Sequence, residues 1–209
     1  MLYANLYVDR LEILPYLRPE ECRGAGVKDC AQLAARLKDG AIRPEDCPGL
    51  SPRKRYALSL ALRAAQIMPP VQSLEFPRPV APDLHEINDP GPEAPVLVTG
   101  NSEFTLTVLT GVLATTTSPF YLLLIDCRGD TADMSVIYRS FTPQRLDQAL
   151  ETHHLARRVS RRRLIIPGVC APLREELAAY TGWEIQAGPI CAGELPLFLA
   201  DYWQPPGEA

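Results

Sequence analysis

The sequence contains no apolar run long enough to cross a bilayer. Its longest apolar runs, such as FYLLLID, are short, whereas a transmembrane helix needs about 20 consecutive apolar residues. The first residues, MLYANLYVDRLEIL, carry acidic side chains and lack an apolar stretch of signal-peptide length. We therefore expect a cytoplasmic protein that has no membrane partner.

Sequence signatures of several common enzyme classes are also absent. There is no P-loop and no recognisable Ser/His/Asp or Cys/His arrangement, and the loop VTGNSEF is not a G-x-G-x-x-G dinucleotide motif. The formal net charge of -4 gives no electrostatic reason to expect binding to nucleic acid. These absences leave open whether the chain is an enzyme at all.

Proline is abundant and unevenly placed. Of the 21 prolines in the 209 residues, eight lie in the stretch PPVQSLEFPRPVAPDLHEINDPGPEAP, from Pro69 to Pro95. Proline fixes φ and has no N–H group, so this stretch cannot sustain a helix or a central strand. We predict three parts: a small helical domain over residues 1–66, an extended proline-rich linker over residues 67–95, and a larger domain over residues 96–209.

The first domain is expected to be helical. The segment CAQLAARLKDG has apolar residues at helical spacing and ends at Gly40, which suits a C-cap. The segment SPRKRYALSLALRAAQIM begins with Ser51 as an N-cap and Pro52 at the first helical position.

The larger domain alternates between short apolar strands and helices. The predicted strands are APVLVTG, FYLLLIDC, MSVIYRSF, RRLIIPG and WEIQAG. The predicted helices are SEFTLTVLTGVLATT, TPQRLDQALETHHL and APLREELAAYTG, with GELPLFLADYW as a final helix or turn. This alternation predicts an α/β fold with a mostly parallel, Rossmann-like sheet.

Ligands of such sheets bind beyond the carboxyl ends of the strands. The loop VTGNSEF lies at such an end and precedes a predicted helix, so Thr99, Asn101 and Ser102 are candidates to hydrogen-bond a ligand. The alternative is that Asn101 or Ser102 caps the helix.

The six cysteines are expected to be reduced thiols or metal ligands, because disulfides are rare in cytosolic proteins. Cys127, Cys170 and Cys191 fall at predicted strand ends, where buried thiols are common. The other three are separated by seven and sixteen residues, without a C-x-x-C pair. Taken alone, this spacing fits a metal site, the remains of one, or three buried thiols.

Together these segments resemble the large (gamma) subunit of the corrinoid iron–sulfur protein of the acetyl-CoA synthase/CO dehydrogenase pathway. In that family an N-terminal domain holds a 4Fe–4S cluster through the pattern C-x2-C-x4-C-x16-C, which falls here on Cys22, Ala25, Cys30 and Cys47. The segments APVLVTGN, LLLIDCRGD, SFTPQRL, RRRLIIPG and TGWEIQAGP followed by LPLFL match its corrinoid-binding domain in order and spacing. The resemblance covers residues 12–60 and 94–200.

The sequence departs from this family in three places. Ala25 stands where a cysteine ligand would be, which leaves a three-iron cluster, a four-iron cluster with another ligand such as Asp29, or no cluster. The proline-rich segment takes the place of the TIM barrel that separates the two domains in the family. The segment after MSVIYRSF is shortened, and Tyr138 falls where the family places a residue below the cobalt. Its phenol could lie under a corrin ring or fill that space.

The resemblance implies cobalamin or another corrinoid as cofactor, and Cys22, Cys30 and Cys47 as ligands of an altered or absent iron–sulfur cluster. It implies a methyl-group carrier with protein partners in a methyl-transfer or redox complex, in which the cluster would reactivate Co(II). Two alternatives are a partner-binding module that has lost its cofactors and a corrinoid accessory or storage protein. The implied corrinoid-binding residues are Thr99, Asn101, Ser102, Ser135, Tyr138, Gly168, Gly188 and Gly193.

Overall fold

The computed structural model describes residues 2–71, 75, 77–200 and 202–207. Its internal contacts divide the chain into two compact units. The sheet unit comprises residues 1–4, 70–110 and 118–189, and the helical unit comprises residues 5–69, 111–117 and 190–209. The predicted domains 1–66, 67–95 and 96–209 stay a prediction, since the units group the chain differently and join residues 190–209 to residues 5–69.

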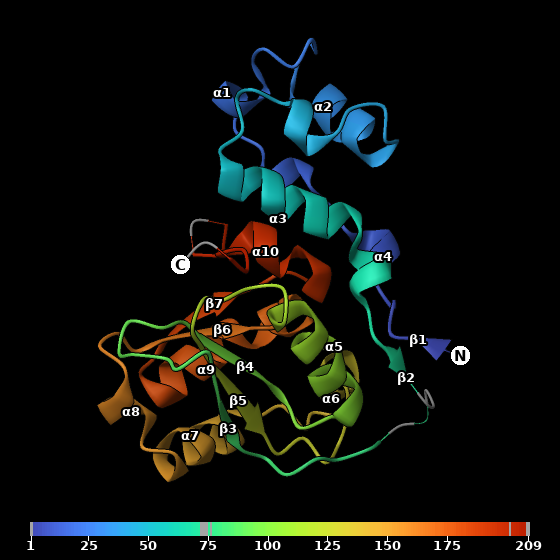
Figure 1. Ribbon diagram of the computed structural model, residues 1–209. Helices are drawn as coiled ribbons and strands as arrows, with labels where there is room; N and C mark the ends of the chain where they lie inside the picture. The colour runs from blue at the N-terminus through green and yellow to red at the C-terminus, as the bar shows by residue number, and fades with distance from the viewer. Residues whose placement is uncertain (1, 72–74, 76, 201, 208–209) are drawn as a thin grey trace. The chain divides into compact units, whose positions relative to one another are not determined.

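Within the described residues, five strands form the main sheet of the sheet unit, in the order β3-β5-β4-β6-β7 (Figure 1). Four of them run parallel, and β3 pairs antiparallel with β5 at one edge. The α/β class is therefore confirmed, with a mixed sheet. The strands are β3 (Leu84–Ile87), β4 (Val96–Gly100), β5 (Phe120–Ile125), β6 (Arg163–Ile166) and β7 (Glu184–Ala187). A separate two-stranded sheet pairs β1 (Leu2–Tyr3) with β2 (Pro70–Val71).

The strand β3 lies inside the segment predicted to be a linker. It contains no proline, and it is an edge strand whose pairing with β5 needs hydrogen bonds on one side only. Among the described residues of the proline-rich segment, pairing with the main sheet is thus limited to one short edge strand, because proline has no N–H group to donate.

Two helices of the sheet unit have a capping residue at one end. The Thr142 side chain accepts a hydrogen bond from the Arg145 N–H at the start of α7, and Gly182 adopts a left-handed conformation after α9. The helical elements are α5 (Glu103–Leu113), α6 (Ala132–Ile137), α7 (Pro143–Thr152), α8 (Leu155–Arg158), the 3-10 helix η4 (Gly168–Leu173) and α9 (Arg174–Thr181). The last residues of α5 belong to the helical unit.

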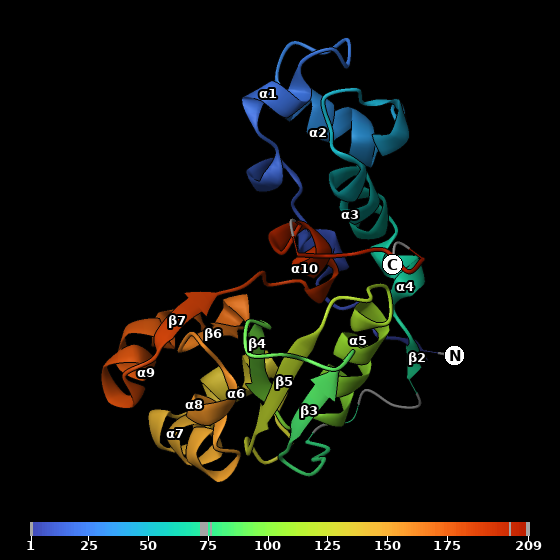
Figure 2. The ribbon, with the colours of Figure 1, turned by 60° about the vertical axis from the view of Figure 1, so that its left-hand side comes forward.

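One face of the sheet carries the main apolar core. Helices α7 and α9 pack against one another beside it (Figure 2). Leu146 of α7 and Leu177 of α9 are fully buried against inward-facing strand residues such as Leu123 and Leu164. Burying such large apolar side chains supplies the main driving force for this arrangement.

The prediction of a strand at MSVIYRSF was wrong, because this segment contains the second half of α6. Thr131 is extended at the N-cap position, and its hydroxyl donates to the Asp133 carboxylate in the first turn. The β-branched residues Val136 and Ile137 suggested a strand. The local hydrogen bonds at the start of the helix override that preference.

The described part of the helical unit consists of short helices and turns. Asp29 caps α2 by accepting a hydrogen bond from the Gln32 N–H, Ser51 caps α3, and α10 packs against α3. The elements are η1 (Val8–Arg10), η2 (Leu14–Tyr16), α1 (Pro19–Cys22), α2 (Cys30–Lys38), η3 (Pro44–Asp46), α3 (Pro52–Leu62), α4 (Ala64–Ile67), η5 (Ala192–Glu194) and α10 (Leu195–Phe198). No helix in the described ranges is long and apolar enough to span a membrane.

Candidate functional site

The loop after β4 brings three predicted ligand residues together but buries them. Thr99, Asn101 and Ser102 are 1%, 2% and 0% exposed. The Asn101 side-chain oxygen accepts hydrogen bonds from the N–H groups of Cys127 (2.8 Å) and Gly129 (3.2 Å). Its amide nitrogen donates to the Val80 carbonyl at 2.8 Å. The Asn101 side chain therefore joins the ends of β4 and β5 to an earlier segment of the chain.

That earlier segment, residues 78–80, lies across the β4 loop, and we call it the cover segment. The Val80 N–H donates to the Asn101 carbonyl at 2.9 Å, and the Glu103 N–H donates to the Arg78 carbonyl at 2.9 Å. The Arg78 guanidinium also pairs with the Glu103 carboxylate at 2.9 Å. An isolated antiparallel β-bridge between Pro79 and Ser102 completes the contact between the cover segment and the loop after β4.

Two buried hydroxyl groups, one at the end of β4 and one in the loop after it, have no hydrogen-bond partner among the described residues. They are Thr99 Oγ1 and Ser102 Oγ. Because Ser102 Oγ is unpaired and Asn101 bonds elsewhere, neither side chain caps α5 within the described part of the chain. Buried polar groups are nearly always paired, so each exception asks for an explanation such as a ligand or water.

Helix α6 presents apolar side chains to solvent at its end. Ile137 is 67% exposed and Tyr138 is 56% exposed. Ser135 differs from them, because it is fully buried and its hydroxyl donates to the Ala132 carbonyl at 2.7 Å within the helix. Of the two predicted site residues in this segment, Tyr138 is therefore exposed to solvent, whereas the Ser135 hydroxyl is already used in a hydrogen bond within the helix.

The three glycines among the predicted corrinoid-binding residues lie in different units of the structure. The Gly168 N–H donates to the Pro189 carbonyl, and the Gly188 N–H donates to the Ile166 carbonyl, so both lie at the ends of β6 and β7. Gly193 belongs to the helical unit, where a Cβ atom would lie 2.7 Å from the Ala64 Cβ. The structure gives Gly193 a packing role within that unit.

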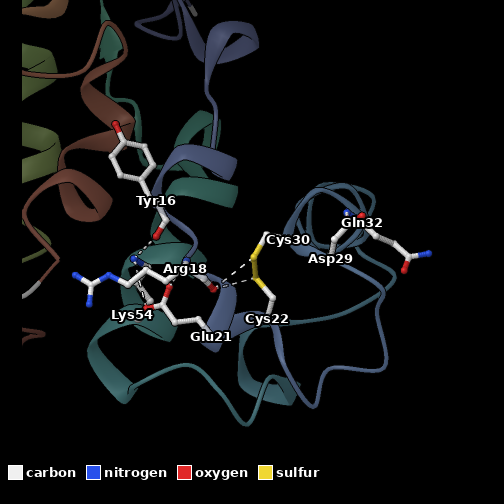
Figure 3. Close-up of a disulfide and its surroundings, with 8 residues drawn as sticks. All are labelled: Tyr16, Arg18, Glu21, Cys22, Asp29, Cys30, Gln32 and Lys54. Carbon is white, nitrogen blue, oxygen red and sulfur yellow. Dashed lines mark hydrogen bonds and ion pairs between the residues drawn. A yellow bond between two sulfur atoms is a disulfide. The ribbon is translucent and has the colours of Figure 1, made fainter.

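Cys22 and Cys30 form a disulfide (Figure 3). The expectation of reduced thiols was therefore wrong for this pair, because α1 ends at Cys22 and α2 begins at Cys30, side by side. Both sulfur atoms lie near the Arg18 carbonyl oxygen, at 3.3 and 3.4 Å. Cys47 is a free and fully buried thiol, and burial raises its pKa.

The segment that carries Cys47 lies against the segment that carries Cys22. A Cβ atom on Gly49 would lie 2.5 Å from the Glu21 carbonyl oxygen, and one on Gly24 would lie 3.3 Å from the Pro48 side chain. Even so, no group of three His, Cys, Asp or Glu side chains among the described residues is arranged to hold a metal ion. With Ala25 at the second ligand position, these residues do not fit a four-cysteine cluster.

The remaining cysteines are buried in the way the sequence predicts. Cys127, Cys170 and Cys191 are all free thiols with negligible exposure. Burial raises the pKa of Cys127 and of Cys170 to about 12, and it raises the pKa of Cys191 as well. Thiolate is the reactive form of cysteine, so burial and a raised pKa both lower the reactivity of these three side chains.

Beside the disulfide lies a polar group that the sequence did not reveal. The Lys54 ammonium donates to the Tyr16 carbonyl and lies 3.8 Å from the Glu21 carboxylate. Both charged side chains are largely buried, at 11% and 16% exposed. These residues line one side of a cavity of about 390 Å³. Nothing local in the sequence signals that a lysine in the first turn of α3 points inward.

Glu194 is a second buried charged group in the helical unit. It accepts hydrogen bonds from the Tyr16 hydroxyl at 2.9 Å and the Glu12 N–H at 3.2 Å. Burial raises the pKa of Glu194 above its ordinary value of 4.5, although these hydrogen bonds oppose the shift. Burial and the neighbouring carboxylate likewise raise the pKa of Tyr16.

We expect the substitution Glu194→Gln to stabilise the protein progressively as the pH rises. A carboxyl group with a raised folded-state pKa favours folding while it is protonated, and that contribution is lost as pH increases through the folded-state pKa. Glutamine does not titrate, and it can accept from the Glu12 N–H while donating to the Tyr16 oxygen. Urea unfolding of both proteins from pH 4 to pH 8 measures the difference. Parallel stability curves would contradict the prediction.

Comparison with known proteins places the chain in a family. The profile of the CO dehydrogenase/acetyl-CoA synthase delta subunit family matches residues 54–199, so the chain belongs to that family. Among its relatives, the predicted resemblance to the large (gamma) subunit is confirmed. The acetyl-CoA decarbonylase/synthase complex subunit gamma of Archaeoglobus fulgidus is 32% identical over 129 residues, which are 62% of this chain and 27% of that protein.

Two further relatives extend the comparison. The subunit of the same name from Methanocaldococcus jannaschii is 25% identical over 198 residues, which are 90% of this chain and 39% of that protein. The corrinoid/iron-sulfur protein large subunit of Moorella thermoacetica is 32% identical over 124 residues, which are 59% of this chain and 28% of that protein. The chain thus spans about two fifths or less of the length of these relatives.

Proposed function

We propose that this protein is a corrinoid-binding carrier that acts in one-carbon methyl transfer. The observation that carries the proposal is the pair of buried, unpaired hydroxyls of Thr99 and Ser102. They lie at the carboxyl end of a parallel strand, where α/β sheets bind ligands. A polar ligand edge at this place would supply the missing hydrogen bonds.

A second feature favours a large flat ligand. Ile137 and Tyr138 offer exposed apolar surface at the end of α6, and a corrin ring is a flat, largely apolar disc. When bound, the cobalt of a corrinoid supplies the methyl-transfer chemistry. The residues that would hold such a group are Tyr138, through its exposed aromatic ring, and Thr99 and Ser102, through their unpaired hydroxyls.

Binding of such a ligand requires the cover segment to move. Ser102 pairs with Pro79, and it is inaccessible while residues 78–80 are hydrogen-bonded to Asn101 and Glu103. The contacts that hold the cover segment are a few hydrogen bonds and one exposed ion pair, each of which contributes little stability. Displacement of this segment is therefore part of the proposal.

The proposal includes protein partners, since relatives are named as subunits of the acetyl-CoA decarbonylase/synthase complex. It includes no four-cysteine iron–sulfur cluster, because Ala25 stands at the second ligand position and Cys22 is bonded to Cys30. A cytoplasmic location without nucleic-acid or membrane partners completes it.

A second candidate function is a partner-binding module that no longer binds a corrinoid. The cover segment favours it, since residues 78–80 already occupy the edge of the sheet where a ligand would bind. The test below distinguishes the two candidates.

We expect the purified protein to retain hydroxocobalamin on gel filtration and to change its visible spectrum. Tyr138→Ala should weaken binding roughly tenfold, since losing an aromatic contact costs about 1.4 kcal/mol. Tyr180 has a similar exposed fraction, 52%, and lies on α9, so Tyr180→Ala is the matched control and should bind like the wild type. Failure of the wild type to retain cobalamin would reject the carrier function and leave the partner-binding module.

A further inference from the structure

The two sulfur atoms of the Cys22–Cys30 disulfide differ in accessibility. Cys22 is 5% exposed, whereas Cys30 is only partly buried. A thiolate from solution must reach a disulfide sulfur along an open path. Cys30 is therefore the sulfur that an incoming thiolate can attack, and Cys22 is the sulfur that leaves.

The site is also prepared for the reduced state. The Arg18 carbonyl oxygen lies 3.3 Å from the Cys22 sulfur and 3.4 Å from the Cys30 sulfur (Figure 3). A disulfide cannot donate a hydrogen bond, but either thiol can. After reduction the two sulfur atoms must move apart, and a freed thiol finds a hydrogen-bond acceptor already in place.

The start of α2 does not depend on the disulfide. The Asp29 carboxylate accepts from the Gln32 N–H at 2.8 Å, and the Gln32 side chain accepts from the Lys28 N–H at 2.7 Å. Leu33 and Leu37 hold the helix in the core.

We propose that Cys22 and Cys30 form a reversible dithiol–disulfide couple that exchanges electrons with a dithiol reductant. A reductant thiolate attacks Cys30 Sγ, the disulfide bond breaks, and Cys22 leaves as a thiolate that takes up a proton. The second thiol of the reductant then attacks the mixed disulfide, and Cys30 is released and protonated. Two electrons and two protons enter the protein, and the reductant ends as a disulfide. This two-electron site stands where the family resemblance predicts a one-electron cluster.

The four other cysteines should react much less readily than the Cys22–Cys30 pair. Cys47, Cys127, Cys170 and Cys191 are buried free thiols, and burial raises the pKa of each. Reagents that act on the folded protein should therefore distinguish one pair of cysteines from the rest.

The test is alkylation of the folded protein by iodoacetamide, followed by mass spectrometry. After air oxidation, no cysteine should be labelled. After millimolar dithiothreitol, Cys30 should be labelled and Cys47, Cys127, Cys170 and Cys191 should not. A sample that is reduced and then reoxidised with excess oxidised glutathione before alkylation should again carry no label at Cys30. Cys47→Ser should behave like the wild type, whereas Cys30→Ser leaves Cys22 without its partner, so its labelling should be the same after air oxidation and after dithiothreitol.

Three results would overturn the proposal. The first is a disulfide that dithiothreitol reduces only in denaturant. The second is a pair that stays reduced under excess oxidised glutathione. The third is reconstitution with iron and sulfide that retains iron and protects Cys22 and Cys30 from alkylation. Cobalamin retention is measured separately, so the corrinoid proposal stands or fails without affecting this one.

Discussion

Replacing Asn101 with alanine is expected to lower the free energy of unfolding by roughly 3 to 5 kcal/mol, since each buried group left unpaired costs about 1–3 kcal/mol. Three groups would lose their partner: the N–H groups of Cys127 and Gly129 and the carbonyl of Val80. Urea unfolding monitored by circular dichroism measures the loss. The reason for so large an effect is that one side chain satisfies backbone groups from two other segments.

Thr99→Val is the matched control for Asn101→Ala. It removes a hydroxyl that is equally buried and next to the same loop but has no partner among the described residues. Removing an unpaired buried polar atom is nearly neutral or stabilising, so this variant should unfold at the same urea concentration as the wild type or higher. Equal destabilisation by both variants would contradict the assignment of Asn101 as the joining residue.

Gly129→Ala is the second variant with a large expected effect, about 3 kcal/mol. Gly129 has φ +81°, and an added Cβ would lie 2.4 Å from the Pro79 nitrogen. A left-handed conformation costs a residue with a side chain about 1–2 kcal/mol, and overpacking costs about 1–3 kcal/mol more. Since the obstruction is backbone, the cover segment must shift. Hydrogen exchange of the Val80 amide should accelerate together with the loss of stability.

Gly182→Ala separates these two costs. Gly182 has φ +69° with nothing within 4 Å of an added Cβ, so this variant should lose only the conformational part, about 1 kcal/mol. Its Val80 amide should exchange at the wild-type rate. If Gly129→Ala and Gly182→Ala lost the same stability, the cover segment would not press on Gly129.

Much of the sheet unit could be predicted from the sequence, because its signals are local. Short apolar runs mark β4, β5, β6 and β7, and a capping threonine followed by proline marks α7. The error at α6 has a local cause too. Val136 and Ile137 favour a strand when read alone, and only the Thr131–Asp133 hydrogen bond shows that a helix has begun.

The rest depends on contacts between distant residues, which no local pattern encodes. The sequence predicts Thr99, Asn101 and Ser102 as neighbours at the end of a strand. It did not show that the Asn101 amide bonds Val80, 21 residues earlier. The spacing of Cys22 and Cys30 likewise carries no sign of a disulfide, because that bond depends on how α1 and α2 meet.

The helical unit is assembled from both early and late parts of the chain, and this sets an order of events during synthesis. Ribosomes add roughly 5–20 residues per second, and early segments usually fold first. Here residues 5–69 must wait for residues 190–209, which supply Glu194 to Tyr16 and place the fully buried Trp203. The sheet unit, whose residues end at 189, can form in the interval. During that interval Cys22 and Cys30 lie in a unit that is not yet complete.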